Sequence, residues 1–176
     1  MNGKLEQAGD RWRLRFEREL AHTPEKVWRA LTEHEHLQAW FPHTIVGEWT
    51  VGAPLRFESK YGDFDGEVLA VQPPSLLEFR WGPDTIRFEV ASASGGDRCT
   101  LTLIDTLDQV GKAARDGAGW HACLDALQDE LDGRAGAAES SGRWAEVHPG
   151  YVEAFGSQAA TIGPPEAVLA DTAAGD

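Results

Sequence analysis

The sequence has few cysteines and no long hydrophobic run. Cys99 and Cys123 are the only two cysteines in 176 residues, and they do not form a CxxC pair. We expect both to be buried free thiols, because Cys99 falls in a predicted strand and Cys123 on the apolar face of a predicted helix. No apolar segment approaches the roughly 20 residues that a membrane-spanning helix needs, and residues 1–6 lack the apolar stretch of a signal peptide. These absences predict a cytoplasmic protein without a membrane partner.

Basic residues are also scarce. The chain has 16 Lys and Arg residues against 29 Asp and Glu residues, which gives a formal net charge of −13. A surface of this charge repels phosphate backbones. We therefore expect no nucleic-acid partner.

Motifs for metal binding and for catalysis are missing as well. Of the six histidines, His34 and His36 lie closest together, but on a helix two residues that far apart point in directions about 200° apart and cannot chelate one ion. The sequence contains no His-x3-His pair, no Gly-x-Ser-x-Gly elbow and no phosphate-binding glycine loop. We predict no metal, no cofactor and no catalytic residue.

The hydrophobic patterning predicts an α+β domain. Residues 11–20 alternate with the period of a half-buried strand. Thr23 and Pro24 have the order of a helix N-cap and first helical position, and a capping box beginning at Thr32 predicts a second short helix that ends at Pro42. Residues 43–107 then read as about six strands separated by glycine- and proline-containing turns, which is typical of an antiparallel meander. Apolar residues at helical spacing predict a long helix over residues 113–131.

The two ends of the chain differ in composition from this middle part. We interpret residues 1–10 as a flexible N-terminus, residues 11–131 as the domain, and residues 132–176 as a tail rich in Gly, Ala and Ser. Within the tail, residues 144–155 carry aromatic side chains and are candidates for docking onto the core, and the end of the chain is expected to be disordered.

Several separated motifs resemble the START-like (SRPBCC) superfamily. They are residues 21–32 (AHTPEKVWRALT), residues 37–42 (LQAWFP), residues 66–74 (GEVLAVQPP) and Gly119-Trp120 followed by Leu124 and Leu127. Within the superfamily, the chain is similar to the group named after the C-terminal domain of the activator of heat-shock protein 90 ATPase. The resemblance implies a helix-grip fold, in which a curved antiparallel sheet of about seven strands wraps around a long C-terminal helix, with two short helices after the first strand. The histidine that this family often has in its last strand is absent here, where Leu103-Ile104-Asp105-Thr106 stands instead.

A strongly twisted sheet cannot lie flat against one helix along its whole length, so a gap is expected between them. We expect this gap to be an apolar ligand pocket lined by aromatic residues, with two leucines of the helix as the opposite wall and Tyr61 at the mouth. The predicted lining residues are Trp40, Phe41, Phe57, Phe79, Trp81, Phe88, Trp120, Leu124 and Leu127. The alternative is that the same aromatics simply fill the core.

The leading functional hypothesis is non-catalytic binding of a small hydrophobic molecule. An alternative is an enzyme similar to polyketide cyclases and aromatases, which needs polar groups inside the pocket. A second alternative, implied by the family's name, is a module that contacts heat-shock protein 90. The sequence is compatible with a monomer or a homodimer.

Overall fold

The computed structural model describes residues 3–134, 140–166 and 168–170. In these residues the sheet begins with two strands, and two short helices follow. Six further strands, a short 3-10 helix and a long helix come next. Another helix and a second short 3-10 helix are the last elements. The elements are β1 (Lys4–Ala8), β2 (Arg11–Leu20), α1 (Pro24–Thr32), α2 (His34–Trp40), β3 (Thr44–Gly47), β4 (Pro54–Glu58), β5 (Phe64–Gln72), β6 (Leu76–Trp81), β7 (Asp84–Ser92), β8 (Cys99–Leu107), η1 (Val110–Lys112), α3 (Ala113–Leu131), α4 (Ser140–Phe155) and η2 (Ser157–Ala160).

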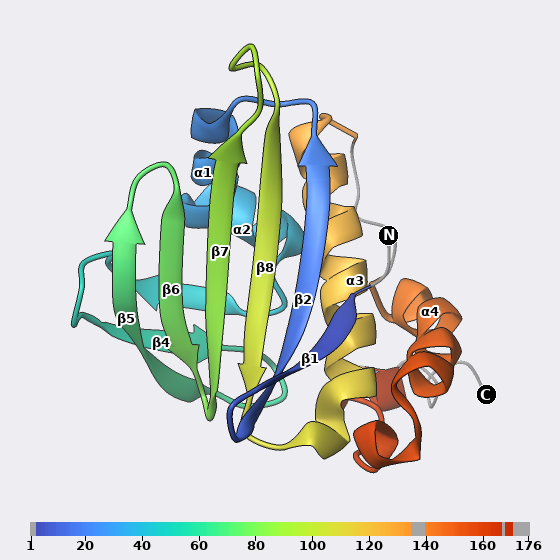
Figure 1. Ribbon diagram of the computed structural model, residues 1–176. Helices are drawn as coiled ribbons and strands as arrows, with labels where there is room; N and C mark the ends of the chain where they lie inside the picture. The colour runs from blue at the N-terminus through green and yellow to red at the C-terminus, as the bar shows by residue number, and fades with distance from the viewer. Residues whose placement is uncertain (1–2, 135–139, 167, 171–176) are drawn as a thin grey trace.

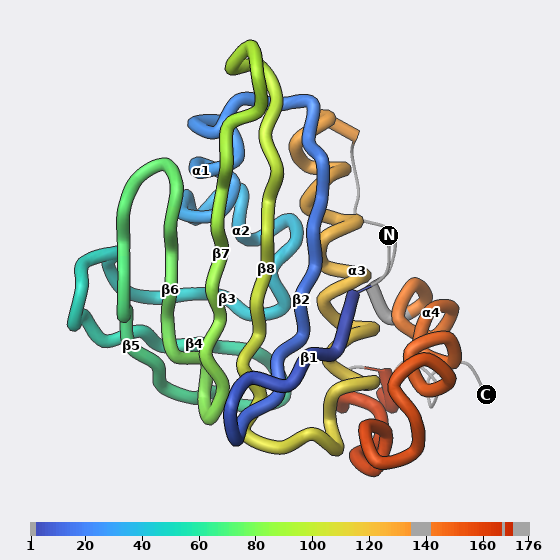
Figure 2. Tube along the Cα trace, viewed as in Figure 1, coloured from blue at the N-terminus to red at the C-terminus, as the bar shows by residue number. Residues whose placement is uncertain are grey.

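The strands form one antiparallel sheet in the order β1-β2-β8-β7-β6-β5-β4-β3. The sheet curves so strongly that β3 and β4 run across behind the upright strand β7 (Figures 1 and 2). The helices α1, α2 and α3 lie on the concave side of the sheet. This arrangement is the helix-grip fold. None of the helices in the described residues combines the length and the apolar character needed to cross a membrane.

The sheet has eight strands, one more than the sequence suggested, because the presumed flexible N-terminus contains β1. This strand pairs with β2, with Leu5 opposite Leu14. Gly9, at φ +65°, forms the turn between them. The strand escaped detection because it lies at the sheet edge and three of its five residues are exposed, so it lacks the buried face that produces an alternating pattern.

The two short helices form as predicted, but the break between them is capped differently. The side chain of Thr23 accepts a hydrogen bond from the Lys26 backbone N–H (3.3 Å), and Pro24 occupies the first turn of α1. The capping box expected from Thr32 does not form. Its hydroxyl donates instead to the Trp28 carbonyl oxygen (2.8 Å), and extended Glu33 separates the helices.

Gly66 on β5, the first residue of the motif at residues 66–74, occupies a position where only glycine fits. Gly66 lies opposite Trp81 of β6. A Cβ atom at this position would lie 2.6 Å from Cε2 of Phe57 and would collide with the Arg80 carbonyl oxygen. Only glycine lets β4, β5 and β6 approach this closely.

The long helix α3 is buried on two sides, by the sheet and by α4, which packs along its outer side (Figure 1). Trp144 and Tyr151 of α4 are buried, so residues 144–155 dock onto the core. Ordered structure continues beyond them, contrary to the expected disordered end: Ala159 in η2 is buried, and the Ile162 N–H donates to the Gly111 carbonyl oxygen (3.0 Å). Residues 171–176 lie outside the described residues.

Candidate functional site

A cavity of about 940 Å³, partly open to solvent, lies between the curled end of the sheet and the first half of α3. Its walls come from the α2–β3 link, the β4–β5 and β6–β7 connections, α3, α4 and the C-terminal segment. The lining residues are Gln38, Phe41, Pro42, His43, Thr44, Glu58, Ser59, Lys60, Tyr61, Phe64, Trp81, Gly82, Pro83, Asp84, Lys112, Arg115, Asp116, Gly119, Trp120, Ala122, Cys123, Trp144, Pro165, Glu166 and Val168.

Four of the residues expected at the pocket border this cavity. Phe41, Trp81 and Trp120 form an aromatic wall, in which the centroids of the two tryptophan rings are 5.4 Å apart and Phe41 lies about equally far from both, at 6.2 Å and 6.0 Å. Tyr61, 36% exposed, lies on the β4–β5 connection that forms part of the rim.

The other six expected lining residues do not border the cavity; they are buried core. They are Trp40, Phe57, Phe79, Phe88, Leu124 and Leu127. The aromatic members pack ring against ring, as in Phe57–Phe79 (5.8 Å) and Trp40–Phe88 (5.9 Å), and thereby fill the space under the middle of the sheet. The gap opens only further along, where the sheet turns away from the N-terminal half of α3.

The β6–β7 hairpin carries polar groups to the cavity. Trp81 and Asp84 face each other across a tight turn in which Gly82 has φ +59°. Near this turn the His43 ring lies edge-on to Trp81, 5.6 Å between centroids. Trp81 Nε1 and His43 Nδ1 are both buried without a hydrogen-bond partner, and burial lowers the pKa of His43, so its ring is neutral at pH 7.

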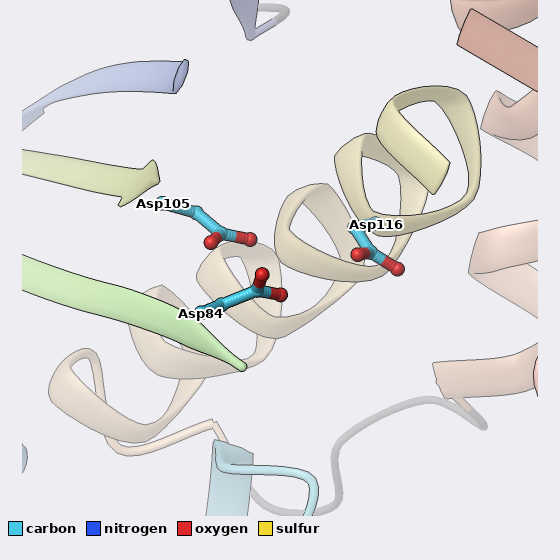
Figure 3. Close-up of side chains that lie close together, drawn as sticks. All are labelled: Asp84, Asp105 and Asp116. Carbon is cyan, nitrogen blue, oxygen red and sulfur yellow. The ribbon is translucent and has the colours of Figure 1, made fainter. Parts of the chain in front are cut away.

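Three carboxyl groups lie close together between the strands β7 and β8 and the helix α3 (Figure 3), and two of them, Asp84 and Asp116, line the cavity. Asp84 begins β7, Asp105 lies near the end of β8, and Asp116 lies in the first turn of α3; one oxygen of each lies within 4.8 Å of the others. Asp105 is completely buried, and its Oδ2 accepts a hydrogen bond from Trp120 Nε1 (2.8 Å). This bond ties the carboxyl cluster to the aromatic wall.

Two cations lie among these carboxyl groups. The buried Lys112 ammonium donates to Asp84 (2.5 Å) and forms an ion pair with Asp108 (2.6 Å). Arg115 donates from Nε to Asp116 (2.6 Å). Although burial lowers the pKa of Lys112, its carboxylate partners outweigh that effect and the pKa is raised, so the side chain is charged at pH 7.

Burial raises the pKa of all three cluster carboxyl groups. The pKa of Asp105 lies well above its usual range because burial is complete and because Asp84 and Asp116 add their negative charge. For Asp84 and Asp116 burial also raises the pKa, and Lys112 and Arg115, respectively, oppose the rise. Such groups can hold a proton, or exchange one, beside a bound molecule.

Replacing Asp105 with asparagine should flatten the pH dependence of stability. Since the folded pKa of Asp105 is raised, the folded state binds more protons than the unfolded state, and stability falls as pH rises from the ordinary carboxyl range through the folded pKa. Asparagine keeps an acceptor for Trp120 and does not titrate. In thermal unfolding from pH 4 to pH 8, the melting temperature of Asp105→Asn should rise relative to that of the native protein as pH rises. The relative increase should reach at least about 2 °C at pH 8.

The matched control is Asp65→Asn on the outer face, where the Asp65 side chain is 80% exposed and pairs with Arg56. This change should shift stability by less than about 0.5 kcal/mol. If the two asparagine variants follow the same pH profile, the burial argument for Asp105 is wrong.

The three carboxyl groups are also the only His, Cys, Asp and Glu grouping in the described residues that could hold a metal ion. The sequence predicted no metal. In this structure the Lys112 ammonium already occupies the cation position next to Asp84, so the cluster is partly neutralised by the protein's own side chains.

Sequence reasoning overlooked this polar wall, although two signals for it were present. Asp105 has the same strand parity as Leu103 and Leu107, which places its carboxyl group on the inner face of β8. Asp116 precedes Trp120 by four residues and therefore shares its side of α3. Asp84, Lys112 and Trp144 carry no local signal, because their positions at the cavity depend on how separate elements pack.

The fold and the site together define a class: helix-grip domains with a partly open cavity between the sheet and the C-terminal helix. Residues 21–132 match the family described as activator of Hsp90 ATPase homolog 1-like protein. This match covers more than half of the chain, and the chain belongs to that family. No curated protein matches the chain significantly.

Solved structures share the fold at low sequence identity. A conserved protein of unknown function from Enterococcus faecalis superposes with a TM-score of 0.74 at 20% identity, covering 86% of this chain and 88% of that one. CalU16 from Micromonospora echinospora gives 0.67 at 20% identity, covering 88% and 94%. The Aha1 dimer from Colwellia psychrerythraea gives 0.61 at 20% identity, covering 70% and 98%.

Proposed function

We propose that this protein binds a small hydrophobic molecule in the cavity bordered by Phe41, Trp81 and Trp120, without changing it chemically. The observation that supports this most directly is the cavity itself. Its volume of about 940 Å³ falls within the roughly 300–1,000 Å³ that ligand sites occupy. Its aromatic wall offers large apolar area, and its rim carries the short connections that would admit a ligand.

The proposal is tested by filling the cavity without removing any contact. Gly119 lies on the cavity wall, and a Cβ atom there would meet nothing within 4 Å. We expect the native protein to bind 9-anthracenemethanol, a neutral tricyclic probe, and Gly119→Leu to weaken binding at least tenfold. Isothermal titration calorimetry measures both affinities.

Gly150 in α4 provides the matched control, because it is also a helical glycine at which a Cβ atom would meet nothing within 4 Å, and it is absent from the cavity wall. Gly150→Leu should bind the probe as the native protein does. Lack of binding by the native protein across a panel of neutral hydrophobic molecules, or equal binding by Gly119→Leu, rejects the proposal.

A second candidate, an enzyme similar to polyketide cyclases and aromatases, is favoured by one observation. Asp84 and Asp116 border the cavity, and burial raises the pKa of both carboxyl groups, as a general acid requires. An enzyme of this class should convert a poly-β-ketone substrate analogue, and Asp116→Asn should abolish conversion while the analogue still binds. Binding without any conversion by the native protein leaves the non-catalytic function.

The family description supports a third candidate, contact with heat-shock protein 90. The large hydrophobic residues exposed in the described residues are Val46, Val51, Tyr61 and Leu169, which come from separate parts of the chain. An absence of any effect on the ATP hydrolysis of the chaperone would count against this candidate. Because the similar structure from Colwellia is a dimer, a homodimer and a monomer are both proposed as oligomeric states of this protein.

A further inference from the structure

The cavity is apolar on one side and acidic on the other. Trp81, Trp120 and Trp144 line it with indole rings. The Asp84 and Asp116 carboxyl groups border the same space from β7 and α3, and Asp105 lies behind them, pointing toward Asp84 between the strand ends and the helix (Figure 3). A ligand that enters the cavity therefore meets indole rings and carboxylates together.

The donors that the protein supplies do not reach every carboxyl oxygen of the cluster. Lys112 is shared by Asp84 and Asp108, and Arg115 donates to one oxygen of Asp116. With Asp84, Asp108, Asp116, Lys112 and Arg115 all charged, these five side chains carry a net charge of −1.

Two oxygens of the cluster remain buried without any hydrogen-bond partner: Oδ1 of the fully buried Asp105 and Oδ2 of Asp116. Buried polar atoms are normally paired, and an unmade bond costs about 1–3 kcal/mol. An additional N–H donor in the cavity, positively charged, would pair with the Asp116 oxygen and offset the excess negative charge. The Asp116 side chain is 11% exposed and lines the cavity.

The aromatic side favours the same kind of group. The face of a tryptophan ring attracts a cation within about 6 Å of its centroid, and the attraction is larger where water is excluded. Trp81 and Trp120 lie with their centroids 5.4 Å apart, and Trp120 is held in place by its bond to Asp105. A cation that donates to Asp116 from the cavity would therefore lie close to indole surface.

We propose that the ligand of this cavity is a hydrophobic amine, with an aromatic or polycyclic body against Phe41, Trp81 and Trp120 and a protonated amino group donating to Asp116. This inference rests on the proposed ligand-binding function and specifies the chemical class of the ligand. An anionic ligand would meet the acidic wall, and a neutral one would leave the charge of the Asp116 carboxylate without an added cation.

Three probes with the same ring system separate these cases: 9-(aminomethyl)anthracene, 9-anthracenemethanol and 9-anthracenecarboxylate. Calorimetric titrations at pH 7 and low salt should show the amine binding at least tenfold more tightly than the alcohol. The carboxylate should bind most weakly. The preference should shrink as salt is added, because screening weakens the charge interaction.

Asp116→Asn identifies the anchor. This variant should bind the amine and the alcohol within about twofold of each other, since the favourable charge is removed, and continued binding of the alcohol shows that the variant is folded. Asp65→Asn, which removes an equivalent charge from the outer face, should keep the native preference.

The outcomes distinguish this inference from the function on which it rests. Tighter binding of the alcohol or carboxylate than of the amine overturns the amine proposal and leaves hydrophobic-ligand binding intact. A tenfold amine preference that persists in Asp116→Asn also overturns it. Failure of all three probes, together with failure of the wider neutral panel, removes the ligand-binding function itself.

Discussion

Replacing Lys112 with methionine should lower the free energy of unfolding by about 3–5 kcal/mol, because the change leaves the buried Asp84 carboxylate without its cation. Lys112 is 5% exposed and Asp84 is 2% exposed, so little water reaches the Asp84 carboxylate to replace the lost partner. For a chain of this size the loss corresponds to a fall in melting temperature of roughly 6–20 °C. Urea unfolding at pH 7 measures it directly.

The effect of pH gives this prediction a specific sign. Without Lys112, the folded-state pKa of Asp84, already raised by burial, rises further. The folded state then binds more protons than the unfolded state, so the variant's loss of stability should be smallest in acid and grow as pH rises.

A double substitution tests whether the pair itself is responsible. Asp84→Asn in the Lys112→Met background should recover part of the lost stability, because it removes the unpaired charge. Arg56→Met is the surface control: Arg56 pairs with Asp63 and Asp65 on the exposed outer face, so this change should cost far less stability than Lys112→Met. Equal losses from Lys112→Met and Arg56→Met would contradict the assignment of Lys112 as a buried structural cation.

Replacing Trp120 with alanine should be comparably damaging, with a loss of about 3–5 kcal/mol. The Trp120 side chain is only 3% exposed, and its ring contacts Phe41, Trp81 and Phe88. Truncation removes these contacts and also leaves Asp105 without its hydrogen-bond donor. Urea unfolding followed by far-ultraviolet circular dichroism measures the loss without relying on tryptophan fluorescence.

Trp120→Phe separates packing from hydrogen bonding. It keeps most of the ring and removes the indole N–H, so it should cost about 1–3 kcal/mol. Trp28→Ala is the control, since Trp28 in α1 is only partly buried, and its loss should be clearly smaller than that of Trp120→Ala. A loss of stability no greater for Trp120→Ala than for Trp28→Ala would show that Trp120 does not join the core to the cavity wall.

The order of elements from β2 to α3 followed from the sequence because those elements bury one face and repeat with a clear period, whereas the helix α4 was not predicted. The long helix over residues 113–131 and the strand over residues 11–20 have the bounds that their apolar spacing indicated. The first strand has no such pattern, because Lys4–Ala8 is held in the sheet by backbone pairing with β2 and not by burial of its side chains.

The candidate site was foreseen only in part, and for a comparable reason. The sequence identified the aromatic residues that face the interior, yet an inward-facing ring either fills the core or borders a cavity, and Phe57 and Trp81 carry the same local signal. Which of the two occurs depends on the curvature of the sheet, and curvature is a property of all eight strands together.

By itself, the sequence determined the periodic elements, the family and a set of apolar residues facing inward, because periodicity and capping are local. Only the tertiary structure decided where the gap lies and that Asp84, Asp105, Asp116 and Lys112 meet beside it. These four residues lie at the start of β7, near the end of β8 and at the start of α3. Their charges become coupled only when folding brings β7, β8 and the start of α3 together and removes the water that would otherwise screen them.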